Sequence, residues 1–438
     1  MLGGGSGNTV AAKPRGRWHP EPIARPNAPT SQVSMALADS ARVRGVLAMF
    51  VLLIGCGPVA SDRCVEVEWT IVLDELRSPS DVVVRADGIV GVLTTGELVE
   101  FDEHGSQIGV HQLLVSENEP LRGQQLYADA NNRWWLTGAG GTRSDGGYQY
   151  WVLRIDPDGT SEAKLLSPEG DIGLHQIIGR GDHVLIGGSD LSNEFQPDEE
   201  PIPGDPEPFV YPVAKVVELD ETLEIVDAWT SSPELAYAPR IFDVGGQVLA
   251  LATPPSIDWA PGELLRLDAF DQPPVWSRTV GLIGAGSEGV HDVASSQRHA
   301  LLLSGARELV DPDAAVEPPE IAITQLRTSV DAWTVDGDIA WTHDLTVGPG
   351  AAGMLAANEH AILARVQPWV AREEPEATLL VIDHEGSRIC EQPTTTARGV
   401  VLAPALAWGP DEFVLLEQTV LDDDPTSQHR LVRLRVSR

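Results

Sequence analysis

The chain has 438 residues, of which 42% are hydrophobic, so it is long enough to bury a substantial core. Its formal net charge at pH 7 is −35, from 65 acidic and 30 basic residues. A surface of this charge repels nucleic-acid phosphates and anionic lipid headgroups, which excludes recognition through a basic groove.

The N-terminal region has the pattern of a secretion signal. Residues 1–34 are rich in Gly, Pro and Arg without periodicity, so we expect them to be disordered and take Met35 as the translation start. Two arginines then precede the nine-residue apolar run Val46–Ile54. This run is too short to span a bilayer and has the length of a signal-peptide core.

The run ends in Leu53-Ile54-Gly55-Cys56, which resembles the lipobox of bacterial lipoproteins. The resemblance implies that residues 35–55 are a signal peptide, that Cys56 is lipidated (a palmitate-type acyl anchor), and that 56–63 form a tether. Gly57 after the cysteine implies sorting to the outer membrane of the cell envelope. The alternative is that the run forms a buried strand or a short anchor helix.

Two further cysteines, Cys64 and Cys390, remain once Cys56 is lipidated. Outside the cytoplasm disulfides persist, so these two residues are a candidate pair. Two buried free thiols would have the same appearance in the sequence, and that alternative stays open.

From residue 81 onward one phrase recurs seven times: alternating apolar residues, a polar turn, then a dense apolar run. Successive copies are 43 to 64 residues apart, which is typical of repeated small antiparallel sheets arranged around an axis. The copies start at Asp81, Gln124, His175, Pro239, His291, Gly353 and Pro404.

A third strand follows each phrase, and in three units a fourth carries Trp229, Trp276 or Trp341. The seventh unit ends one strand short, while residues 64–73 form a leading strand whose Trp69 matches the recurring position. We therefore predict an all-β, seven-bladed β-propeller of four-stranded antiparallel blades over 64–438, closed by the N-terminal strand. This closure resembles that of WD-repeat and quinoprotein-type propellers.

Long insertions rich in carboxylates and proline begin at Ser192, Ala306, Gln367 and Leu421, between the predicted second and third strands. Loops on a rigid scaffold are the usual place for binding residues, so this acidic face is a candidate recognition surface. A cationic protein or calcium would suit its charge, although Asp156–Gly159 lacks the remaining ligands of a twelve-residue calcium loop. The alternative is solvated decoration.

The first positions of the phrases should meet at the mouth of the central channel. The candidate ligand-binding residues there are Asp81, Gln125, His175, Arg240, His291 and Asp292, beside Gln124, Gln176 and Met354. Two histidines and an aspartate at equivalent positions could hold a divalent cation or an anion. Polar residues also line propeller channels without any ligand, so we predict no metal site and no cofactor.

Two motifs are rejected. Gly284–Gly289 matches a dinucleotide fingerprint, but that fold requires a helix after it, and the repeat predicts a strand. Ser287, His291 and Asp292 have the residue types of a hydrolase triad but lack the strand-turn-helix elbow.

These observations favour a monomeric, membrane-anchored binding or scaffolding module without catalytic residues. Its partner would be an envelope protein or an extracellular ligand. The alternative is a propeller enzyme acting on carbohydrate or an oxidisable small molecule, for which His175, His291 and Arg240 are a partial constellation.

Overall fold

The computed structural model describes residues 64–73, 79–116, 119–142, 148–166, 172–195, 211–231, 239–252, 262–280, 288–309, 323–345, 351–368, 378–393, 399–420 and 427–437. They form thirty β-strands. Among these residues no helix has the length and apolar character needed to cross a bilayer. The predicted signal peptide, Cys56 and the tether lie outside the described residues.

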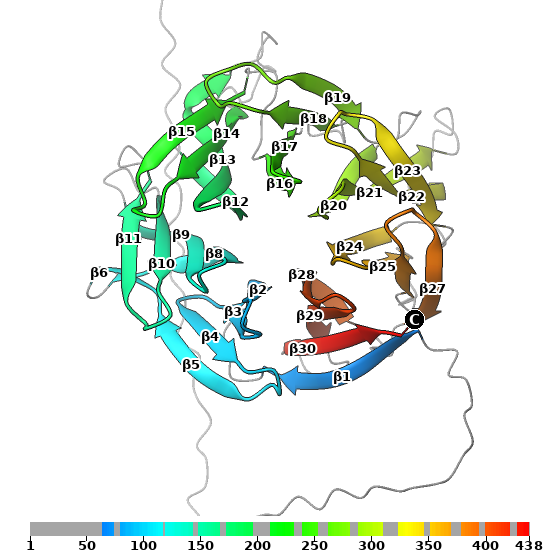
Figure 1. Ribbon diagram of the computed structural model, residues 1–438, viewed down its shortest axis with the longest axis horizontal. Helices are drawn as coiled ribbons and strands as arrows, with labels where there is room; N and C mark the ends of the chain where they lie inside the picture. The colour runs from blue at the N-terminus through cyan, green and yellow to red at the C-terminus, as the bar shows by residue number, and fades with distance from the viewer. Residues whose placement is uncertain are drawn as a thin grey trace, which may run out of the picture. The chain divides into compact units, whose positions relative to one another are not determined.

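The strands form seven four-stranded antiparallel sheets arranged as blades in a ring, and a further hairpin of two strands (Figure 1). The predicted all-β, seven-bladed propeller is confirmed. Blades 1 to 3 contain β2 (Asp81–Val84), β3 (Val90–Leu93), β4 (Glu97–Phe101), β5 (Gln107–Gln112); β8 (Arg122–Ala128), β9 (Trp134–Thr142), β10 (Tyr148–Ile155), β11 (Ser161–Leu165); and β12 (Ile172–Arg180), β13 (His183–Phe195), β14 (Tyr211–Leu219), β15 (Ile225–Thr230).

Blades 4 to 6 contain β16 (Arg240–Val244), β17 (Gln247–Ala252), β18 (Gly262–Leu267), β19 (Trp276–Val280); β20 (Glu288–Ser295), β21 (Ala300–Leu309), β22 (Ile323–Trp333), β23 (Ile339–Leu345); and β24 (Ala351–Ala357), β25 (Ile362–Pro368), β26 (Thr378–Ile382), β27 (Arg388–Pro393). Blade 7 contains β28 (Gly399–Gly409), β29 (Glu412–Val420), β30 (Ser427–Val436) and β1 (Val65–Val72). The extra hairpin, β6 (Leu114–Ser116) and β7 (Glu119–Pro120), lies between blades 1 and 2 in the sequence.

The core is divided among the blade interfaces. Seven clusters of buried apolar side chains occur, each made by the facing strands of two neighbouring blades. Because successive residues of a strand point to opposite faces of the sheet, a blade that is packed on both sides needs apolar residues in both sets. This explains the dense apolar run in each phrase, which forms the second strand.

Antiparallel order sorts the connections onto two faces of the ring. The turns from first to second and from third to fourth strand lie on one side, which we call the turn face. The connections from second to third strand, together with the starts of the innermost strands, lie on the other side, which we call the loop face.

Strand β1 closes the ring. It lies beside β30 in the ring (Figure 1). The two strands pair from Val65↔Val436 to Val72↔Arg430, and Trp69 lies opposite Arg433. The backbone N–H of Leu73 continues the ladder by donating to the carbonyl oxygen of His429, 2.8 Å away. The predicted closure by residues 64–73 is therefore confirmed, and it removes an exposed edge from β30.

The recurring tryptophans join the outermost strand of one blade to the next blade. The indole N–H groups of Trp69, Trp276 and Trp341 donate to backbone carbonyls in the third-to-fourth turn of the following blade, at 2.8–3.0 Å. Under the Trp341 ring lies Gly386, which has a φ of 85°, and a Cβ there would be 2.7 Å from the ring. Glycine is therefore required both by the backbone and by the aromatic contact.

Three of the acidic insertions are shorter than predicted. Strand β13 continues to Phe195, β21 to Leu309 and β25 to Pro368, so the residues from Ser192, Ala306 and Gln367 onward extend the second strands. Backbone pairing with β22 holds the β21 extension, whereas β13 pairs with β14 again at Phe195 after a register shift, and such pairing needs no apolar alternation. The remainder of each insertion lies outside the described residues.

Candidate functional site

The predicted channel-mouth residues occupy matching registers. On the innermost strands, Asp81 pairs with Leu93, Gln125 with Thr137, Gln176 with Gly187, Arg240 with Leu251, Asp292 with Leu303 and Met354 with Arg365. Each therefore lies at the same level of its blade, toward the loop face. The repeat phrase located these equivalent positions correctly.

Three of these side chains bond to the next blade rather than project toward a ligand. Asp81 accepts a hydrogen bond from the Leu126 N–H at 2.8 Å, and Gln176 accepts one from Ile241 N–H at 2.7 Å. Asp292 accepts one from Leu355 N–H at 2.7 Å. These three contacts, which we call the inner staples, join blades 1 to 2, 3 to 4 and 5 to 6.

Burial sets the charge of the two acidic staples. Desolvation raises the pKa of Asp81 to about 7, although the N–H groups of Leu126 and Val82 favour its carboxylate. Burial also raises the pKa of Asp292, opposed by backbone N–H groups and by the Arg240 charge. A proton on Asp81 can therefore be present near neutral pH without any ligand.

His175 and His291 share a backbone feature that the sequence did not reveal. In β12 the pairing register shifts between Leu174 and Gln176, and in β20 it shifts between Val290 and Asp292. Each histidine is therefore the extra residue of a β-bulge, as is Gln124 in β8. Blades 3 and 5 are not adjacent, and the two histidine side chains lie outside what the structure describes.

The remaining candidates offer little convergence. Arg240 is exposed and Gln125 is partly buried at the starts of blades 4 and 2. Within the described part of the chain, no three side chains of the His, Cys, Asp or Glu types group together as metal ligands. The residues after Gly289 form strand β20, so the dinucleotide motif has a strand where it needs a helix.

The sequence reasoning missed a buried pair of charges. Arg365 on β25 and Glu417 on β29 are 5% and 3% exposed. Arg365 follows Leu363 by two residues, and Glu417 follows Leu415 by two; both leucines belong to the apolar cluster between blades 6 and 7. Residues two apart in a strand point to the same side, so both charged side chains point into that interface. Burial lowers the pKa of Arg365 and the Glu417 charge opposes this. The sequence did contain a signal for this pair: the apolar runs of the sixth and seventh repeats each include one charged residue, at neighbouring registers.

The acidic insertions share one face. The connections 196–210, 310–322, 369–377 and 421–426 each join a second strand to a third strand, in blades 3, 5, 6 and 7. They contain fifteen Asp and Glu residues and a single Arg. Antiparallel order places both ends of all four on the loop face, which the sequence predicted.

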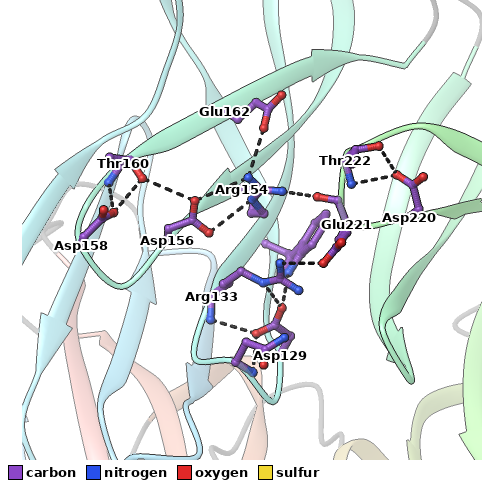
Figure 2. A network of polar contacts seen from close by, with 12 residues as sticks. Asp129, Arg133, Arg154, Asp156, Asp158, Thr160, Glu162, Asp220, Glu221 and Thr222 are labelled. Carbon is purple, nitrogen blue, oxygen red and sulfur yellow. Dashed lines mark hydrogen bonds and ion pairs between the residues drawn. The ribbon is translucent and has the colours of Figure 1, made fainter.

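On the turn face, charged groups between blades 2 and 3 are satisfied by one another (Figure 2). Arg133 donates to Asp129 at 2.6 Å, and Arg154 donates to the Glu221 carbonyl and, at 3.1 Å, to Glu162. Both guanidinium groups lie over the Trp135 ring, at 5.7 and 5.9 Å. Because its donors are engaged within the protein, this network stabilises the interface between the blades.

The turn face also has a depression of about 510 Å³ over blades 4 to 6. Its lining includes the turn at Gly245 and Gly246, the turn at Ser296, and the side chains of Asn358 and His384. The volume is within the range of small-molecule sites. Its polar groups are largely used in turn structure: Ser296 accepts from the His299 N–H at 3.0 Å, and Asn358 accepts from Ala361 at 2.8 Å.

Cys64 and Cys390 form a disulfide between the start of β1 and β27 of blade 6, with Cα atoms 6.1 Å apart. This separation is ordinary for a disulfide. Beside it the side-chain amide of Gln392 accepts a hydrogen bond from the Val65 N–H at 3.1 Å and donates one to the Val65 carbonyl at 3.0 Å. The first described residues are thereby held to blade 6 as well as to β30.

Comparisons with known proteins identify the fold. No family profile matches the sequence, and no curated protein is significantly similar to it. Among solved structures, the chain is similar to the Pan2 WD40 domain of Neurospora crassa, with 12% identity, a TM-score of 0.52, and coverage of 86% of this chain and 97% of that one. It is also similar to hydrazine synthase of Kuenenia stuttgartiensis, with 11% identity, a TM-score of 0.50, and coverage of 81% and 96%.

A third similarity is to uncomplexed acylaminoacyl peptidase of Pyrococcus horikoshii, with 11% identity and a TM-score of 0.50. There the match covers 83% of this chain and 53% of the other protein. At such low identity these similarities establish a β-propeller and no shared chemistry.

Proposed function

We propose that this chain is an extracytoplasmic, lipid-anchored binding or scaffolding module that uses its acidic loop face to hold a cationic envelope protein or extracellular ligand. The observation that carries the proposal is the placement of four acidic connections on one face of a closed ring. A rigid scaffold that presents several loops together is a common arrangement for recognition.

The contacts of the polar side chains at the channel mouth favour a binding function over a catalytic one. Three of the polar side chains at its mouth, those of Asp81, Gln176 and Asp292, already accept hydrogen bonds from neighbouring blades. A group held in this way is poorly placed to act on a substrate, because its acceptor is committed to the fold. The charge of the four connections instead favours a partner that carries Lys and Arg.

The lipid anchor has its own test. Mass spectrometry of the protein isolated from bacterial membranes should find acyl chains on Cys56 as the first residue of the mature chain. Replacing Cys56 by Ala should abolish acylation and release the protein from the membrane fraction. Retention of the variant in membranes after a carbonate wash would contradict lipid anchoring.

The binding function is tested by crosslinking and affinity capture from the envelope with the full chain. One variant has the fifteen acidic residues of the four connections changed to Asn and Gln, which preserves loop length and removes charge. A matched control changes Asp158, Asp271 and Asp336 on the turn face to Asn. We expect loss of the captured partner with the first variant only. Capture that is equal in both, or turnover of a sugar or alcohol panel by the purified protein without a captured partner, would contradict the proposal and favour an enzyme.

A further inference from the structure

The first described residue, Cys64, lies on the face of the propeller opposite the strand ends that flank the acidic connections. Strand β30 runs from Ser427, just after connection 421–426, to Val436, so it ends on the turn face. Strand β1 is antiparallel to it and begins beside Val436. Cys64 therefore lies on the turn face, where its carbonyl receives the Ser437 N–H at 2.8 Å.

The disulfide fixes this exit point. Without it, a pull on the preceding chain would load the first rungs of the β1–β30 ladder, which can open one hydrogen bond at a time at about 1 kcal/mol each. With it, Cys64 is joined covalently to β27 of blade 6, and the Gln392 amide holds Val65 on both sides of its peptide. The strand cannot peel from its free end while that bond is intact.

The two ends of β1 lie on different faces. If the strand peeled, the ordered chain would begin near Leu73, whose N–H bonds to His429 at the loop-face end of β30. The exit would move across the thickness of the blade, about 26 Å for eight strand residues. The preceding chain would also gain the nine residues 64–72, about 30–32 Å of reach.

We propose that the Cys64–Cys390 bond is an orientation clasp. It keeps the tether on the turn face, so that a chain anchored through residues 56–63 faces the membrane with its turn face and presents the loop face to partners in the aqueous phase. The proposal rests on the anchored binding function for its biological use. Its geometry depends only on where the chain enters the propeller.

Tether length is consistent with this orientation, and the charge of the turn face sets its distance from the bilayer. The eight residues 56–63 reach at most about 26–29 Å when fully extended, so the propeller stays within one blade thickness of the bilayer. The turn face carries carboxylates in its third-to-fourth turns, among them Asp102, Asp158, Asp220 and Asp383. Anionic headgroups repel such groups, so this face should stand off from the bilayer rather than adhere to it.

The test places the full chain on neutral phosphatidylcholine vesicles through a synthetic lipid joined at residue 56, which removes any dependence on natural lipidation. Two dyes on blade 1 form a matched pair: one at His104, an exposed residue of the turn face, and one at Thr95, an exposed residue of the loop face. A quencher attached to the lipid headgroups reports which dye is near the membrane.

In the oxidised protein we expect severalfold stronger quenching at His104 than at Thr95. After mild reduction of the folded protein, and in the C64S/C390S variant, the difference should decrease, because β1 can then fray from its Cys64 end, while the circular dichroism of the blades is retained. Equal quenching of the two dyes in the oxidised protein would overturn the orientation. An asymmetry that reduction leaves unchanged would overturn the role of the disulfide. Neither result bears on whether Cys56 is acylated or whether the acidic connections bind a partner.

Discussion

The inner and outer halves of the blades hold the ring together by different chemistry. Near the axis, the polar groups on first and second strands are the inner staples, of which Asp81 is buried and Gln176 and Asp292 are half-buried, and the buried Arg365–Glu417 pair. At the rim, half-buried tryptophans bond to backbone carbonyls and pack over turn glycines. Polar residues near the axis of a propeller can therefore be structural, because side chains of the preceding blade satisfy the backbone N–H groups of Leu126, Ile241 and Leu355 on the inner strands.

The largest expected effect is at the buried charges of the inner half. Replacing Glu417 by Leu leaves the Arg365 guanidinium in the blade 6–7 interface without its opposing charge. We expect a loss of about 3–5 kcal/mol in the free energy of unfolding. It should appear as a lower urea midpoint with retained blade structure in the absence of denaturant.

The double variant R365M/E417L is the matched control, since it removes both charges and keeps apolar volume. It should recover most of the stability lost in E417L. If the single and double variants unfold at the same midpoint, the two charges do not act on one another and the inner half is held by apolar packing alone.

The inner staples give the second effect. Changing Asp81 or Asp292 to Ala removes the acceptor of Leu126 or Leu355, and a buried N–H without a partner costs about 1–3 kcal/mol. The Asn variants keep an amide oxygen at the same place and should lose less. Hydrogen exchange provides a local readout: the Leu126 amide should exchange faster in D81A than in D81N.

The same inner and outer regions show what the sequence could predict. The blade count, the four-strand pattern and the closing strand followed from apolar alternation and from the position of Trp69, because these features depend on local periodicity. The role of Asp81 did not follow, because its partner is the Leu126 N–H of the next blade. A backbone donor has no side-chain signature, so a staple and a channel ligand look alike in sequence.

Other differences have similar causes. The predicted equivalence of His175 and His291 is correct for the backbone, yet both residues are bulges, which alternation cannot distinguish from regular strand. The extension of β13 to Phe195 was missed because Ser192–Glu194 are polar and the ladder with β14 resumes at Phe195, opposite Tyr211, after a register shift. Arg365 and Glu417 lie on separate repeats, and only alignment of their registers brings them together.

A pair of turn glycines distinguishes the cost of backbone strain from the cost of an aromatic contact. Gly386, in the β26–β27 turn at the rim, and Gly88, in the inner β2–β3 turn, both have a φ of 85°. A Cβ at Gly386 would meet the Trp341 ring, whereas one at Gly88 would meet nothing within 4 Å. We expect G88A to cost about 1–2 kcal/mol from the left-handed backbone alone. G386A should cost about 1 kcal/mol more because the ring must move. Equal thermal shifts for the two variants would mean that the tryptophan contact contributes nothing.

The smallest effect is the pH dependence, in which Asp81 at the axis and His299 in the β20–β21 turn have opposite signs. Asp81, at the axis, has a folded pKa raised to about 7 from a reference value of 3.8, so its stabilising contribution is complete below about pH 4 and is lost as the pH rises through 7. His299 packs edge-on against the rim residue Trp341. Burial, together with the charges of His384 and Arg298, lowers the pKa of His299 below 6.5. Its contribution is therefore present above pH 6.5 and is lost on acidification.

Urea midpoints measured from pH 4.5 to 8 should separate the two contributions. D81N should flatten the decline toward pH 8, because Asn does not titrate, and H299Q should flatten the decline toward pH 4.5. Each variant should leave the other limb of the profile unchanged, since the two groups lie in different interfaces. If D81N alters the acidic limb instead, the axial carboxyl is already ionised in the folded protein, and the N–H groups of Leu126 and Val82 outweigh the desolvation that accompanies its burial.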